Sequence, residues 1–162
     1  MARLRNYVVL PVAISNRNGS AELQLNAYEA SSSLLAPDPE GIRKWITKEH
    51  FEVVDSVTVA TMRLDTFMDS VGLKRIDFLK VDAQGLDLEV VKSAGDRLAD
   101  IARIQLEATI APYRQYVGAP EKSTIVDFME SKGFRLVREE VQTDGQEANL
   151  TFIRDHVGAE RR

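Results

Sequence analysis

The stretch from residue 76 to residue 95, IDFLKVDAQGLDLEVVKSAG, limits the possible folds most, because it combines a strand, an acidic turn and a helix. Residues 76–81 form a short apolar run, which is typical of a parallel strand that is buried on both faces. Residues 86–94 repeat apolar side chains at helical spacing, and Gly95 is suited to close the helix. The stretch therefore predicts an α/β fold that contains a parallel sheet.

Asp82 directly follows the expected strand, and Gly85 allows the chain to turn tightly before the helix. Ligands of open α/β sheets bind beyond the carboxyl ends of the strands, which makes Asp82 a candidate site residue. A carboxylate at this place can also cap the next helix, where free amide groups favour negative charge. Both interpretations stay open. The tetrapeptide DAQG also matches a motif of nucleotide-hydrolysing proteins, but the sequence contains no GxxxxGK[ST] loop that would bind phosphate.

A second strand is expected over residues 103–109, RIQLEAT, where apolar and polar side chains alternate. Glu107 lies near the carboxyl end of this strand, as Asp82 does in the first one, so the two carboxylates could face one crevice. Tyr113 and Tyr116 lie in the loop that follows and could form the aromatic wall of a pocket. The alternatives are a solvated acid at a strand end and a packed pair of tyrosines.

The amino-terminal part is expected to form a hairpin followed by a long loop. Residues 7–14 are rich in β-branched and aromatic residues, and Asn18-Gly19 would turn the chain into the alternating segment 21–25. Residues 26–39 contain a serine run and show no period, so we interpret them as a loop. Long loops are often functional, and a plain surface connection is the alternative.

The carboxyl-terminal part is expected to close the fold with an antiparallel hairpin. Residues 134–140 and 149–153 read as strands, and Asp144-Gly145 between them is a turn signal. A helix capped by Ser123 or Thr124 and ended by Gly133, with apolar residues at Ile125, Val126, Phe128 and Met129, would precede this hairpin.

Length and composition indicate one domain, covering residues 1–162, with 44% apolar residues to fill a core. The net charge of −4 and the interleaving of basic with acidic residues argue against nucleic-acid binding and favour small-molecule or protein partners. The absence of cysteine excludes disulfides and thiolate ligands, and His50 lacks neighbours at metal-ligand spacing, so we expect no metal. No apolar run reaches membrane-spanning length, and we expect a cytoplasmic protein without membrane contact.

Several of these segments together resemble the FkbM family of methyltransferases. They are PVAISNRNGSAELQL, SSSLL, VTVATMRLDTFMDSVGL, IDFLKVDAQGLDLEVVKSAG, RIQLEAT and FMESKGF, and they span most of the chain. The resemblance implies part of a Rossmann-like class I methyltransferase sheet with helices on both faces and a closing antiparallel hairpin. It also implies transfer of a methyl group from S-adenosylmethionine to a hydroxyl of a sugar, a lipid or another small molecule.

The resemblance suggests roles for seven residues. Asp82 is the candidate catalytic residue, near the acceptor hydroxyl. The candidate residues for binding the acceptor are Glu107, Tyr113 and Ser33. The candidate residues for binding the cofactor are Ala13, Ile14 and Ser15.

The sequence departs from the family pattern in two respects. The family motif KxDxEGxE is present with Gln84 and Asp87 in two acidic positions, and Gln84 keeps the shape of glutamate without its charge. The family's glycine-rich cofactor loop and ribose-binding acid precede the part that matches here. We therefore expect the carboxyl-terminal portion of such a domain, weak or inactive as an isolated chain. The alternative is a noncatalytic binding or scaffold module with the same frame.

The order of strands in the family implies an open edge beside the strand over residues 76–81. Open edges expose unpaired amide and carbonyl groups, which natural proteins usually cover. We expect that either residues 7–14 move next to this strand or a second chain pairs there, as a homodimer or a partner complex.

Overall fold

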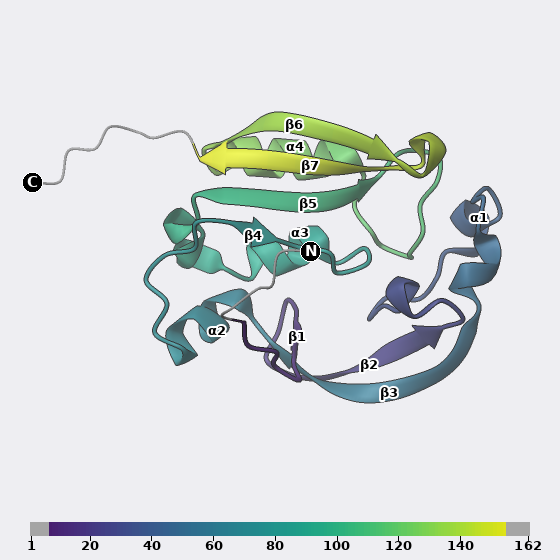
Figure 1. The fold of residues 1–162 in the computed structure, drawn as a ribbon, viewed down its shortest axis with the longest axis horizontal. Helices are drawn as coiled ribbons and strands as arrows, with labels where there is room; N and C mark the ends of the chain where they lie inside the picture. Colours follow the sequence, from purple (N-terminus) through teal and green to yellow (C-terminus); the bar gives the residue numbers. More distant parts are fainter. Residues whose placement is uncertain (1–6, 155–162) are drawn as a thin grey trace, which may run out of the picture.

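A four-stranded sheet forms the larger part of the molecule (Figure 1). The computed structural model describes residues 7–154. The strand order is β4-β5-β7-β6, with β4 parallel to β5 and the other neighbours antiparallel. The strands are β4 (Leu79–Lys80), β5 (Arg103–Thr109), β6 (Phe134–Gln142) and β7 (Glu147–Arg154). The expected α/β class is confirmed, and so is the closing hairpin.

A second sheet of three strands lies below the first one in Figure 1. It consists of β1 (Ala13–Ile14), β2 (Gly19–Asn26) and β3 (Val53–Met62), with β3 in the middle. The α-helices are α1 (Pro39–Ile42), α2 (Leu64–Ser70), α3 (Asp87–Lys92) and α4 (Lys122–Ser131). The 3₁₀ helices are η1 (Glu29–Ser31), η2 (Lys48–Phe51), η3 (Gly95–Asp100) and η4 (Thr143–Gly145).

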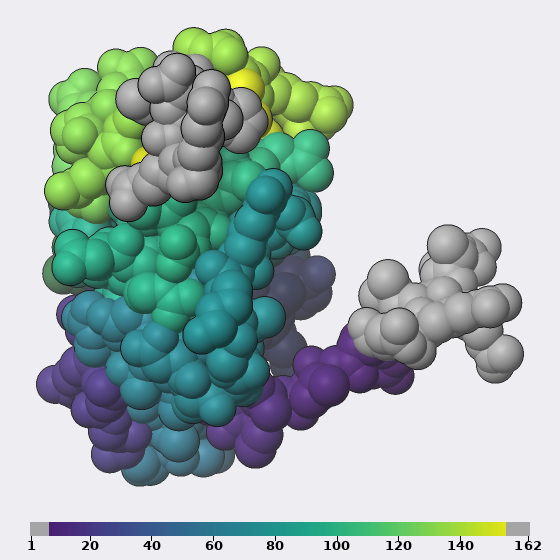
Figure 2. Space-filling model, turned by 90° about the vertical axis from the view of Figure 1, so that its left-hand side faces the viewer, coloured from purple at the N-terminus to yellow at the C-terminus, as the bar shows by residue number. Residues whose placement is uncertain are grey.

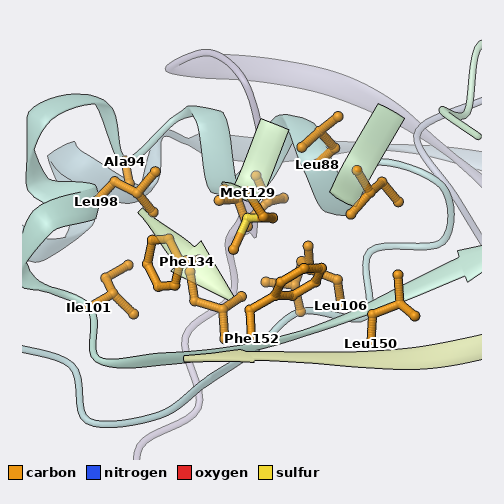
Figure 3. Close-up of a cluster of buried hydrophobic side chains, with 14 of the residues drawn as sticks. Leu88, Ala94, Leu98, Ile101, Leu106, Met129, Phe134, Leu150 and Phe152 are labelled. Atoms are coloured by element: carbon orange, nitrogen blue, oxygen red, sulfur yellow. The ribbon is translucent and has the colours of Figure 1, made fainter. Parts of the chain in front are cut away.

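The core follows from the alternating pattern of β5. Ile104, Leu106 and Ala108 are buried, whereas the residues between them are only half-buried. These buried side chains form one cluster with those of the neighbouring strand β7 and with those of α2, α3, η3 and α4, which cover the same face of the sheet. Figure 3 shows Leu88 and Met129 of the helices close to Leu106. One face of the sheet is therefore packed against helices.

The opposite face of the sheet carries the alternate, more polar side chains of β5 and β7. The segment from Tyr28 to Phe51 faces Glu107 and Glu147 on this side. It contains the short helical elements η1, α1 and η2 and no long helix. The expected packing of helices on both faces is not confirmed, because α2, α3 and α4 all contribute to the same core.

The expected amino-terminal hairpin is wrong. β1 and β2 do not pair with each other, because each pairs with β3. The Asn18 side chain instead accepts a hydrogen bond from the amide of Arg63 at 2.9 Å and donates one to the Thr66 hydroxyl at 3.1 Å. Asn18 therefore ties the chain to the start of α2, a long-range contact that the sequence does not reveal.

The prediction that residues 7–14 pair with the strand over residues 76–81 is also wrong. Only Ala13–Ile14 is a strand, and it runs parallel to the end of β3. The side chains of Tyr7, Val8 and Val9 are largely exposed, and this segment extends away from the body (purple in Figure 2). Within residues 7–154, β4 pairs with β5 alone. Pairing of its outer edge with a second chain stays a prediction.

Candidate functional site

The turn between β4 and α3 is the centre of the candidate site. Gln84 and Gly85 both adopt left-handed backbone conformations, with φ of 48° and 93°. A Cβ atom on Gly85 would lie 2.9 Å from the ring of Tyr116, so a larger residue would have to displace that buried ring. The expected tight turn at Gly85 therefore has two causes, its backbone conformation and the close approach of Tyr116.

Asp82 lies at the carboxyl end of β4, as the sequence predicts, and its side chain is partly exposed. One of its oxygens accepts a hydrogen bond from Lys80 Nζ at 2.8 Å, and the other accepts one from Gln84 Nε2 at 2.8 Å. The interpretation of Asp82 as a helix cap is wrong. The oxygens of Asp82 accept no hydrogen bond from the backbone amides at the start of α3, and the amide of Ala83 in the turn donates to Asp87 Oδ2 at 3.3 Å.

Asp87, at the start of α3, is buried and holds the turn against the neighbouring strand. Its second oxygen accepts a hydrogen bond from the amide of Glu107 at 3.2 Å. Burial raises the pKa of Asp87 to about 6, although the two backbone hydrogen bonds act against this shift. This acidic position of the motif therefore supports the structure by joining the turn after β4 to β5.

Gln84 connects Asp82 with a buried tyrosine. The hydroxyl of Tyr116 lies 2.8 Å from Gln84 Oε1 and 2.7 Å from the carbonyl oxygen of Ser31. Burial raises the pKa of Tyr116, which keeps the hydroxyl protonated as a donor. Ser33 Oγ donates to the carbonyl oxygen of Gln84 at 2.7 Å, so the turn is also bonded to the serine loop.

A hollow of about 310 Å³ opens beside the outer edge of β4, and we call it the strand-edge hollow. Two of the three candidate cofactor residues, Ala13 and Ile14, line it together with Asp82 and Ser33. Ser15 does not line it, because this residue is buried and its amide donates to the carbonyl oxygen of Met62 at 2.8 Å.

A second hollow of about 330 Å³ lies on the other side of Gln84, and we call it the aromatic hollow. Its lining includes Tyr28, Trp45, Phe51, Glu107 and Glu147. Asp82 and Glu107 therefore line different hollows rather than one crevice, and Gln84 lines both. Tyr113 lines neither hollow; its ring packs against the small cluster around Trp45.

Glu107 has a strongly perturbed carboxyl group. Burial, followed by the charges of Glu147, Asp82 and Asp87, raises its pKa to about 8, while the charge of Lys80 acts in the opposite direction. Glu107 faces Asn149 across the ladder, and Glu147 lies two residues away on the same face. Glu107 is half-buried and lines the aromatic hollow, so its carboxyl group is shielded from solvent only in part.

Sequence reasoning missed Gln84 as a bridge and Glu147, and it chose Tyr113 rather than Tyr116 as the site residue. Tyr116 lies in an irregular loop with no pattern that separates it from Tyr113. Glu147 begins β7, in which Ala148, Leu150 and Phe152 are buried, so its side chain points to the opposite face of the sheet. That this is the face of Glu107 becomes clear only from the pairing of β5 with β7.

The composition of the site limits its chemistry. No group of three histidine, aspartate or glutamate side chains within residues 7–154 is placed to hold a metal ion.

Among the helices of the same residues, none combines the length and the apolar character that a membrane span requires.

Comparison with known proteins gives one match. Residues 1–136 match the model of the Methyltransferase FkbM domain, which covers more than half of the chain. Neither the curated proteins nor the solved structures gave a match.

Glu107→Gln is expected to stabilise the protein at high pH. The pKa of Glu107 is raised from 4.5 to about 8, so the folded state keeps a proton that the unfolded state loses across this interval, and stability falls as the pH rises. Glutamine removes this penalty, and we expect a gain of about 1–3 kcal/mol at pH 9 that vanishes near pH 4.5.

Urea unfolding at pH 5 and pH 9 measures this difference. Glu22→Gln, which changes an exposed glutamate of β2, is the matched control and should show no such dependence. An equal effect of Glu107→Gln at both pH values would contradict the buried, repelled carboxyl group.

Proposed function

The chain belongs to the FkbM methyltransferase family, and we propose that it transfers a methyl group from S-adenosylmethionine to a hydroxyl of a small-molecule acceptor. One observation carries this proposal: two hollows of ligand size meet at Gln84, next to the partly exposed carboxylate of Asp82. Transfer between two bound molecules requires adjoining sites, because proximity and orientation supply much of the rate.

We assign the cofactor to the strand-edge hollow. Its volume of about 310 Å³ is in the range of small-molecule sites, and its walls combine apolar side chains with one carboxylate, which suits a nucleoside. Ala13 and Ile14 would contact the cofactor on one side and Asp82 on the other. The bound cofactor would supply an electrophilic methyl group.

We assign the acceptor to the aromatic hollow, with its hydroxyl at the boundary formed by Gln84. From this boundary the hydroxyl can reach Asp82, whose Oδ1 lies 2.8 Å from Gln84 Nε2. Asp82 would accept the proton of the hydroxyl as the methyl group is transferred. Ser33, assigned to the acceptor from the sequence, would instead fix the turn through its bond to Gln84.

The glutamine in the family's acidic position is compatible with this role. Its amide group donates to Asp82 and accepts from Tyr116, which glutamate at the same place could not do without repelling Asp82. Gln84 thus holds the Asp82 carboxylate in position.

A noncatalytic module is the second candidate. The sequence contains no glycine-rich loop for close backbone approach to the cofactor, so the contacts that this chain offers S-adenosylmethionine are those of the lining of the strand-edge hollow. Such a module would bind small molecules in the aromatic hollow without transferring methyl groups.

S-adenosylmethionine is expected to bind this chain no more tightly than millimolar, at the strand-edge hollow. A titration followed by ¹H–¹⁵N NMR should shift the amides of residues 13–14 and 79–84, whereas that of Glu147 in the aromatic hollow should stay unchanged. Micromolar affinity would contradict the expectation that this lining binds the cofactor weakly without a glycine-rich loop, and shifts confined to other residues would contradict the assignment of the hollow.

Asp82→Asn is expected to lower methyl transfer by ~10²–10⁴-fold in any active preparation of this domain, because the general base is lost. The fold should persist, since the Asp82 side chain is partly exposed and asparagine keeps its shape. Formation of S-adenosylhomocysteine measures the rate. Asp77→Asn, which changes an exposed aspartate paired with Arg75, is the control. A rate within a few-fold of the parent would exclude Asp82 as the base.

A further inference from the structure

The aromatic hollow has one wall of rings. Tyr28 stacks on His50 with 4.6 Å between the ring centroids, and Trp45 meets Phe51 edge-on at 5.5 Å. The Trp45 ring is held in place, because its Nε1 donates to the carbonyl oxygen of Tyr113 at 2.6 Å. The segment that carries these rings is anchored to the rest of the site by Tyr116, whose ring also meets that of Phe51 at 5.8 Å.

The facing wall carries two glutamates, and Lys80, which is outside the lining, is a cation whose charge acts on Glu107. Glu107 and Glu147 line the hollow, and no lysine or arginine is among its lining residues. The oxygens of Glu147 accept hydrogen bonds from Gln115 Nε2, at 3.1 Å, and from the Thr143 hydroxyl. Within residues 7–154, the Glu107 carboxyl group accepts none. Its raised pKa agrees with this lack of a partner.

This combination selects one class of ligand. An anion would be repelled by the two glutamates wherever they are ionised, and an apolar group would take solvent away from the Glu107 carboxyl group, which has no hydrogen-bond donor within residues 7–154. A divalent metal ion would need three ligating side chains at suitable positions, which the described residues do not provide. A cationic nitrogen, in contrast, is attracted both by carboxylates and by the faces of aromatic rings.

We propose that the aromatic hollow binds an organic cation, an amino or quaternary ammonium group carried by the methyl acceptor. This assignment rests on the proposed methyl transfer, and it makes the acceptor a hydroxylated amine, such as an amino alcohol or an amino sugar. The cation lies between the rings and the two glutamates, and the acceptor hydroxyl lies at Gln84, the residue shared by both hollows.

Choline, which carries a quaternary ammonium group and a hydroxyl, is the probe. Trp45 is the single tryptophan, so its indole N–H gives one NMR signal that reports on this hollow. Choline added to the 162-residue chain should shift this signal and the amides of Glu107 and Glu147. The neutral isostere 3,3-dimethylbutan-1-ol should bind at least about fivefold more weakly, because it lacks the charge.

Substitution of the charged wall provides the second arm. Glu147→Gln should weaken choline binding at least about fivefold, while Glu22→Gln on the exposed side of β2 should leave it unchanged. Glu107→Gln replaces Glu147→Gln if the latter does not keep the native spectrum. The proposal is overturned if choline gives no shift at Trp45 up to about 100 mM, if the isostere binds equally well, or if a neutral polyol binds where choline does not.

This experiment involves no cofactor and no methyl transfer, so its outcome is separable from that of the proposed function. Choline binding without amide shifts at residues 13–14 and 79–84 on addition of S-adenosylmethionine would retain the cation site and reject the assignment of the cofactor to the strand-edge hollow. The reverse result would reject only the cation site.

Discussion

The hydroxyl of Tyr116 is the contact on which the candidate site depends. It lies within hydrogen-bond distance of Ser31 and of Gln84, which are separated from it by 85 and 32 residues in the sequence. It therefore joins the serine loop, the acidic turn and the loop after β5. The Tyr116 ring is fully buried and rests against Gly85, whose lack of a side chain permits the approach.

The position of Gln84 follows from this contact and explains the layout of the two hollows. Its amide has to face Asp82 and its carbonyl oxygen Tyr116, because the opposite orientation would place an oxygen against a carboxylate. The side chain is consequently held between the strand-edge hollow and the aromatic hollow. Asp87 supports the same turn by accepting a hydrogen bond from the backbone of β5. Of the two acids of the motif, Asp82 is therefore partly exposed and Asp87 is buried.

The parts of the fold governed by local pattern could be predicted from the sequence. The alternation of residues 103–109 fixed which side chains of β5 enter the core, and the apolar run before Asp82 placed this acid correctly at a strand end. The closing hairpin also followed from its own strands and turn.

The remaining parts depend on contacts between distant segments, which periodicity does not encode. Asn18-Gly19 has the composition of a hairpin turn, but the bonds of Asn18 to Arg63 and Thr66 decide its conformation. Tyr113 and Tyr116 are alike in sequence context, and only the packing around Gly85 and Phe51 distinguishes the tyrosine that matters for the site. Glu107 and Asp82 were expected in one crevice, and the intervening side chain of Gln84 separates them.

A double-mutant cycle of Tyr116→Phe and Gln84→Ala, measured by urea unfolding, tests the central contact most directly. If the hydroxyl bonds to the Gln84 side chain, the two free-energy changes are coupled by about 0.5–3 kcal/mol. Additivity within about 0.3 kcal/mol would show that the two side chains act independently and would contradict the structure of the site.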